Sequence, residues 1–116
     1  MDPQHQYIVG IGELLFDIHG QQTLLGGAPV NFSFHAHQLL SQFGYQGNVV
    51  SVVGNDELGI QAIDQLRTAG LEISAIQCHD TLPTGVARIH TDADDHHFEI
   101  VEDVSWDALS WMPSLE

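Results

Sequence analysis

Apolar and polar positions along the chain follow two patterns, short β-rich runs and longer segments with helical spacing. Residues 7–12 and 48–54 are short apolar runs rich in β-branched side chains, which is typical of buried parallel strands. Residues 31–43 and 57–69 carry apolar side chains at helical spacing. With a further short strand at 73–77, the predicted order is β-α-β-α-β, which favours right-handed crossovers in a parallel sheet.

Proline, aspartate and glycine residues mark the ends of both predicted helices. Pro29 follows a pair of glycines and suits the first turn of a helix, and Gly44 lies where a left-handed residue would end that helix. Asp56 is a credible N-cap for the second helix, which Gly70 would end.

The remaining segments predict a second, smaller sheet. Residues 85–91 and 97–102 alternate between apolar and polar side chains around a turn-like stretch at 92–96, which indicates a half-exposed antiparallel hairpin. Residues 14–25 are expected to add strands to the same sheet, and residues 105–111 to start a helix. Open edges and an apolar face on such a sheet predict a homodimer formed through these strands.

Composition excludes several classes of partner. The 116 residues carry a formal charge of −14, with no lysine and only Arg67 and Arg88 as fixed positive charges. This charge would repel phosphate backbones and anionic lipids, so neither nucleic acid nor a membrane is expected as a partner. Cys78 is the only cysteine, and no apolar run approaches membrane-spanning length, which together predict a cytoplasmic protein.

The candidate chemistry centres on a glycine turn. Gly26 and Gly27 let the backbone approach a ligand closely, and the helix that follows would present unpaired amides to it. Asn31, one turn further on, offers both a donor and an acceptor, and Asp17 lies just beyond the first strand, where open α/β sheets bind ligands. Such groups suit a hydroxylated ligand such as a sugar.

Four motifs in this order resemble the ribokinase-like (PfkB-type) carbohydrate kinases, particularly the fructokinase-like members. They are GELLFD at 12–17, GGAPVN at 26–31, VGNDELG at 53–59 and PTGVAR at 83–88. The resemblance covers nearly the whole chain. It implies the N-terminal part of a ribokinase-like αβα sandwich, with a parallel sheet, helices and a small antiparallel β lid formed by residues of about 14–25 and 84–102.

The resemblance also implies roles for particular residues. Asp17, Gly26, Gly27, Asn31 and Arg88 would bind the sugar, with the Asp17 carboxylate accepting hydrogen bonds from hydroxyl groups. Alternatives remain for three of them: Asp17 caps a turn, Gly26 serves only the turn, or Arg88 forms a cross-strand ion pair with Glu99 or Glu102.

The family uses ATP and Mg²⁺, but its glycine-rich phosphate-binding signature and catalytic aspartate lie in a C-terminal nucleotide-binding portion absent from these 116 residues. No catalytic residue, no metal site and no strong ATP binding are therefore expected here.

The implied parent activity is ATP-dependent phosphorylation of a hydroxyl group on a sugar or nucleoside. This chain would supply the sugar-binding half and the lid, and would be inactive alone. One alternative is a non-catalytic binding or dimerisation module derived from a sugar kinase. Another is a small Rossmann-like or flavodoxin-like regulator. The sequence leaves open which sugar is bound and whether the chain itself acts as an enzyme.

Overall fold

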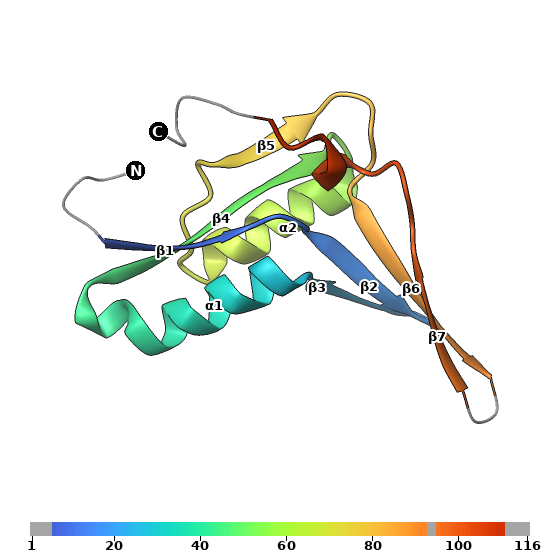
Figure 1. The fold of residues 1–116 in the computed structure, drawn as a ribbon, viewed down its shortest axis with the longest axis horizontal. Coiled ribbons are helices and arrows are strands. Elements are labelled where there is room, and N and C mark those ends of the chain that lie inside the picture. Colours follow the sequence, from blue (N-terminus) through green and yellow to red (C-terminus); the bar gives the residue numbers. More distant parts are fainter. Residues whose placement is uncertain (1–5, 93–94, 111–116) are drawn as a thin grey trace.

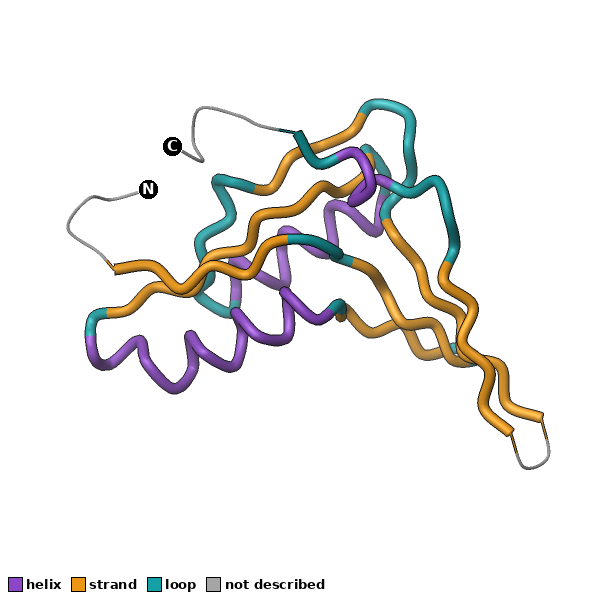
Figure 2. The backbone as a smooth tube through the Cα atoms, in the orientation of Figure 1, coloured by secondary structure: helices purple, strands orange, loops and turns teal. Residues whose placement is uncertain are grey.

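The computed structural model describes residues 6–92 and 95–110, which form an α/β body and a second sheet projecting from one end of it (Figure 1). Figure 2 shows the strands of the projecting sheet continuing outward, well beyond the helices. We call this second sheet the lid. The predicted α/β class with a smaller β unit is confirmed.

The body has the predicted β-α-β-α-β order. Its elements are β1 (Gln6–Ile11), α1 (Ala28–Leu40), β4 (Tyr45–Gly54), α2 (Glu57–Thr68) and β5 (Ile76–His79). The three strands are parallel, in the order β1-β4-β5, so each crossover moves the chain one strand further across the sheet. Neither helix of the described residues is long and apolar enough to cross a membrane.

The N-terminal end of α1 agrees with the prediction, and its C-terminal end differs. The helix begins at Ala28 after Gly27 turns the chain at φ 102°, so Pro29 lies in the first turn and Asn31 one turn further on, as predicted. Its far end passes into a short 3₁₀ turn, η1 (Ser41–Phe43), before Gly44 at φ 88° ends it as predicted.

The second half of the body is closer to prediction. Asp56 is the N-cap of α2, because its side chain accepts a hydrogen bond from the Gly59 amide. The strand expected at 73–77 instead begins at Ile76, because the Ile76 amide bonds to the Ile73 carbonyl in a turn.

Both helices cover the same face of the parallel sheet. The core there joins Val49 and Val53 of β4 with Val30 of α1 and Leu66 of α2. β4 is buried from residue 47 to residue 54, which accounts for its continuous apolar run. Because β4 is the central strand, the segments that leave the carboxyl end of the sheet do so around it.

The opposite face of β4 meets a single 3₁₀ turn, η2 (Ser105–Ala108), where a longer helix was expected. The buried Ser105 hydroxyl donates to the Val52 carbonyl at 2.8 Å, which holds this turn against the strand. Residue 111, the last of the predicted helix, lies outside the described residues.

The lid contains β2 (Leu15–His19), β3 (Gln22–Gly26), β6 (Gly85–Asp92) and β7 (Asp95–Ile100), in the order β3-β2-β6-β7. The predicted hairpin is present as the antiparallel pair β6–β7, and the strands expected within residues 14–25 form a second antiparallel pair, β2–β3. The sheet as a whole is mixed rather than antiparallel, because β2 and β6 both run outward from the body and pair in parallel (Figure 1). The predicted turn at 92–96 is tighter, since Asp92 already pairs with Asp95.

Candidate functional site

The predicted glycine turn joins β3 to α1. Gly26 ends β3 and is buried, and Gly27 follows at φ 102° as the N-cap of α1. A Cβ atom on Gly27 would lie 2.6 Å from the backbone carbonyl oxygen of Glu13. Both the backbone conformation and the space at this position therefore require glycine.

Asp17 lies directly against this turn. Its side chain is half-buried in β2, and a Cβ atom on Gly26 would be only 2.8 Å from the Asp17 Oδ2 atom. The structure thus brings together two of the predicted site residues from neighbouring strands. The absence of a side chain at Gly26 leaves room for the carboxylate.

Apolar side chains flank Asp17 on its face of the lid. The strand register aligns Leu24, Asp17, Ala87 and Ile100 in one row across all four strands. Leu24 and Ile100 at the two ends of the row are 62% and 57% exposed. A carboxylate between apolar neighbours can accept hydrogen bonds from hydroxyl groups while the neighbours contact the CH groups of the same ligand.

The start of α1 offers fewer amides than the sequence indicated. The Ala28 amide donates to the Glu13 Oε1 atom at 3.3 Å, Pro29 has no N–H group, and the Asn31 amide bonds to the Gly27 carbonyl at 3.0 Å. Because the Glu13 carboxylate already lies at this positive helix end, a phosphate here would meet a like charge. The arrangement favours an uncharged ligand over an anionic one.

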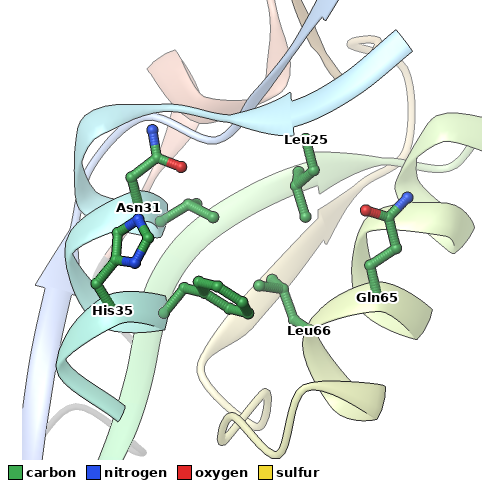
Figure 3. Close-up of a pocket in the computed structure, with 7 residues that line it drawn as sticks. Leu25, Asn31, His35, Gln65 and Leu66 are labelled. Carbon is green, nitrogen blue, oxygen red and sulfur yellow. The ribbon is translucent and has the colours of Figure 1, made fainter. Parts of the chain in front are cut away.

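Asn31 lines a cavity to which Asp17 does not contribute. A cavity of about 260 Å³ lies between α1 and α2, with Asn31 and His35 on one side and Gln65 on the other (Figure 3). Its lining residues are Leu25, Val30, Asn31, Phe34, His35, Gln65 and Leu66. Leu25 pairs with Phe16 whereas Asp17 pairs with Leu24, so the cavity and Asp17 lie on opposite faces of the β2–β3 hairpin.

Arg88 is also separated from Asp17. It is exposed on β6 and aligned with Ile18, the residue after Asp17, so its side chain lies on the opposite face of the lid. Glu99 is its partner across the hairpin, but the Glu99 Oε2 atom lies 3.2 Å from His90 Nε2. Among the side chains that the structure describes, no ion pair of Arg88 is found, so the ligand role and the ion-pair role both stay predictions.

One arrangement was not predicted from the sequence. Besides capping α2, the Asp56 carboxylate accepts two hydrogen bonds from Thr84, the residue before β6. Partial burial alone would raise the pKa of Asp56, but the hydrogen bonds from Thr84 and Gly59 outweigh it and hold the pKa below its ordinary value. The sequence signal was the GNDELG motif itself, in which only a capping role was recognised for Asp56.

Groups that could hold nucleotide phosphates or Mg²⁺ are few among the side chains that the structure describes. Over residues 6–90 and 99–110, no group of three or more His, Cys, Asp or Glu side chains that could hold a metal ion is found. Of the two arginines, Arg67 lies 3.4 Å from Asp64 on the exposed side of α2, and Arg88 lies on the lid. Binding of nucleotide phosphates generally needs amide cradles, cations and Mg²⁺ together.

The parallel body, the projecting lid, the glycine turn and the carboxylate beside it define an α/β protein with a candidate ligand site where the lid leaves the body. The chain belongs to the pfkB family of carbohydrate kinases, which it matches over residues 6–110. No match was found among curated proteins.

Solved structures share this fold. An uncharacterized sugar kinase from Pyrococcus horikoshii is 25% identical, with a TM-score of 0.75 over 87% of this chain and 36% of that one. The fructokinase from Xylella fastidiosa is 25% identical, with a TM-score of 0.73 over 90% of this chain and 34% of that one. Both of these proteins have also been solved with ATP. The chain therefore spans about a third of the length of the structures it matches.

Proposed function

We propose that this chain is the N-terminal, sugar-binding portion of a PfkB-type sugar kinase, whose parent reaction is phosphorylation of a sugar hydroxyl by ATP and Mg²⁺. The contact of Asp17 with the glycine turn carries the proposal, since it joins a hydrogen-bond acceptor to a close backbone approach beside apolar surface. The family match and the likeness to fructokinases support it.

In this proposal the sugar lies against Asp17, Gly26 and Gly27. The carboxylate accepts hydrogen bonds from two hydroxyls, and the glycines allow the ring to approach the backbone. The Glu13 carboxylate disfavours a phosphorylated ligand at the helix end, which fits the unphosphorylated substrate of a kinase. Asn31 and Arg88 remain separate candidates, because Asn31 lines the cavity between the helices and Arg88 lies on the opposite face of the lid from Asp17.

The chain alone would bind the sugar without transferring a phosphoryl group. It spans about a third of the kinases it resembles in structure, and its sequence contains no match to the family's glycine-rich signature with its catalytic aspartate. A reducing, cytoplasmic location belongs to the same proposal, because the one cysteine cannot form an internal disulfide.

Isothermal titration calorimetry with fructose, ribose and a nucleoside, in the absence of ATP, tests the binding role. Saturable binding of one sugar that is lost in Asp17→Ala and retained in Asp64→Ala would support it, because Asp64 is an exposed acidic residue far along α2. Binding of a flavin or nucleotide in place of a sugar would favour the regulator alternative. Consumption of ATP by the chain alone in the presence of the bound sugar would contradict the proposed inactivity.

A second proposal is a homodimer formed through the lid. Leu24 and Ile100 are exposed on the same face, and β3 and β7 are the edge strands of this sheet. A second copy would cover both the apolar side chains and the unpaired edges.

A further inference from the structure

The junction between body and lid is held by buried hydroxyl groups. Ser51, Thr84 and Ser105 are each at most 2% exposed. The Ser51 hydroxyl donates to the Gly12 carbonyl at 2.5 Å, just before the chain enters β2. Ser105, just after the chain leaves β7, bonds to Val52 through its hydroxyl and to the Pro83 carbonyl through its amide, each at 2.8 Å. Each of these bonds therefore involves a segment in which the chain passes between the body and the lid.

Thr84 makes more of these hydrogen bonds than Ser51 or Ser105. Its hydroxyl donates to the Asp56 Oδ1 atom at 2.6 Å and accepts from the Gly54 amide at 2.8 Å. Its amide donates to the Asp56 Oδ2 atom at 2.9 Å. Asp56 Oδ1 also accepts the Gly59 amide at 2.9 Å, so one carboxylate joins the start of α2 to the start of β6.

Two glycines make room for this arrangement. A Cβ atom on Gly54 would lie 2.6 Å from the Thr84 amide nitrogen and 2.9 Å from Asp56 Oδ2. A Cβ atom on Gly59 would lie 3.2 Å from both Asp56 Oδ1 and the Thr84 hydroxyl, and closer still to the Gly54 carbonyl oxygen. The spacing of glycines in the GNDELG motif is therefore the spacing that this contact needs.

Helix capping alone does not explain these bonds. An N-cap needs one acceptor for one amide, which a serine supplies as well as an aspartate. Here the second carboxylate oxygen and both donors of Thr84 are used between separate elements, and two of the four bonds involve a charged acceptor and a residue outside α2.

We propose that Asp56 and Thr84 act as a clasp that sets the position of the lid, and so of Asp17, relative to the body. The path is short. Thr84 precedes Gly85, Gly85 pairs with Leu15, and Asp17 follows two residues along the same strand, paired with Ala87. Asp56 and Thr84 are thus positioning residues for a ligand beside Asp17, and this part of the inference rests on the proposed sugar-binding function.

Three variants separate the clasp from the cap. Asp56→Ser keeps an N-cap acceptor for α2 but cannot reach both donors of Thr84. Thr84→Val keeps the shape but removes the hydroxyl, and Thr84→Ser restores it as the conservative rescue. Nitroxide labels are placed on cysteines at Gln61 of α2 and Thr23 of β3, both exposed, in a Cys78→Ser background.

Pulsed electron paramagnetic resonance then measures the distance between body and lid, and calorimetry measures fructose binding. We expect Asp56→Ser and Thr84→Val to shift or broaden the distance distribution and to weaken fructose binding about tenfold, with α2 retained by circular dichroism. Thr84→Ser should behave as the wild type. An unchanged distance distribution in both Asp56→Ser and Thr84→Val would overturn the clasp.

The distance measurement and the calorimetry distinguish failure of the clasp from failure of the proposed sugar binding. If the wild-type chain binds no sugar but the distance distribution still responds to the variants and is rescued by Thr84→Ser, the clasp stands and the proposed sugar binding falls. If sugar binds and neither the distance nor the affinity responds, the proposed function stands and the clasp falls. Should Thr84→Val fail to fold, Asp56→Ser gives the same comparison with the helix cap intact.

Discussion

Gly26 and Gly27 are adjacent, yet alanine should have different effects at the two positions. At Gly27, alanine would have to adopt φ near 102° and place its Cβ atom 2.6 Å from the Glu13 carbonyl oxygen. Such a backbone conformation costs about 1–3 kcal/mol for a residue with a side chain, and the overlap with another backbone segment adds to it. We expect Gly27→Ala to lower the free energy of unfolding by about 3 kcal/mol or more, out of roughly 5–15 kcal/mol for a domain.

At Gly26, the new Cβ atom would instead meet the Asp17 Oδ2 atom, the end of a flexible side chain, at 2.8 Å. Rotation of Asp17 away from its preferred position relieves this contact for about 0.5–1.5 kcal/mol. The fold should therefore survive in Gly26→Ala, while the displaced carboxylate weakens fructose binding about tenfold.

Urea unfolding followed by circular dichroism measures the first effect, and calorimetry with fructose measures the second. Gly20→Ala is the control, because Gly20 also has a positive φ, 61°, but no atom lies within 4 Å of the added Cβ, so overlap is absent there. A Gly27→Ala variant no less stable than Gly20→Ala would refute the role of the Glu13 carbonyl. A Gly26→Ala variant that binds fructose like the wild type would refute the placement of the sugar at Asp17.

Three further predictions concern the Asp56 carboxylate, the lid surface and the two separate candidate residues. The wild type should lose more stability than Asp56→Ser as the pH falls through and below 3.8. Because the pKa of Asp56 is lowered in the folded state, its contribution to the free energy of unfolding is complete above 3.8 and is lost as the carboxylate is protonated. Urea titrations that show the same pH dependence of the free energy of unfolding in both proteins would contradict this. Leu24→Asp should shift the chain from dimer to monomer in size-exclusion chromatography with light scattering, whereas Phe32→Asp on exposed α1 should not. Asn31→Ala and Arg88→Ala should each weaken fructose binding about threefold or more if these residues belong to the site, and unchanged affinity in either variant would remove that residue from it.

Local patterns were sufficient for the body of the fold. β4 and α2 were predicted closely because a continuous apolar run, an aspartate cap and a terminal glycine each act within a few residues. The parallel pairing of β2 with β6 was not predicted, since nothing in either strand specifies a partner so distant in the sequence.

The same limit applies to the candidate site. Asp17 and the glycine turn came together because the β2–β3 hairpin is local. Arg88 lies on the other face because its direction depends on a long-range register, in which a shift of one residue reverses every side chain. The bonds between Asp56 and Thr84 likewise depend on tertiary contact between segments that each look ordinary alone.

The parallel pairing of β2 with β6 also has a consequence for the order of folding. The β2–β3 hairpin closes within a dozen residues, but β6 lies beyond the whole β4-α2-β5 segment. During synthesis β2 would therefore keep one edge unpaired until β6 emerges, and an open strand edge of this kind is a template for pairing with another chain.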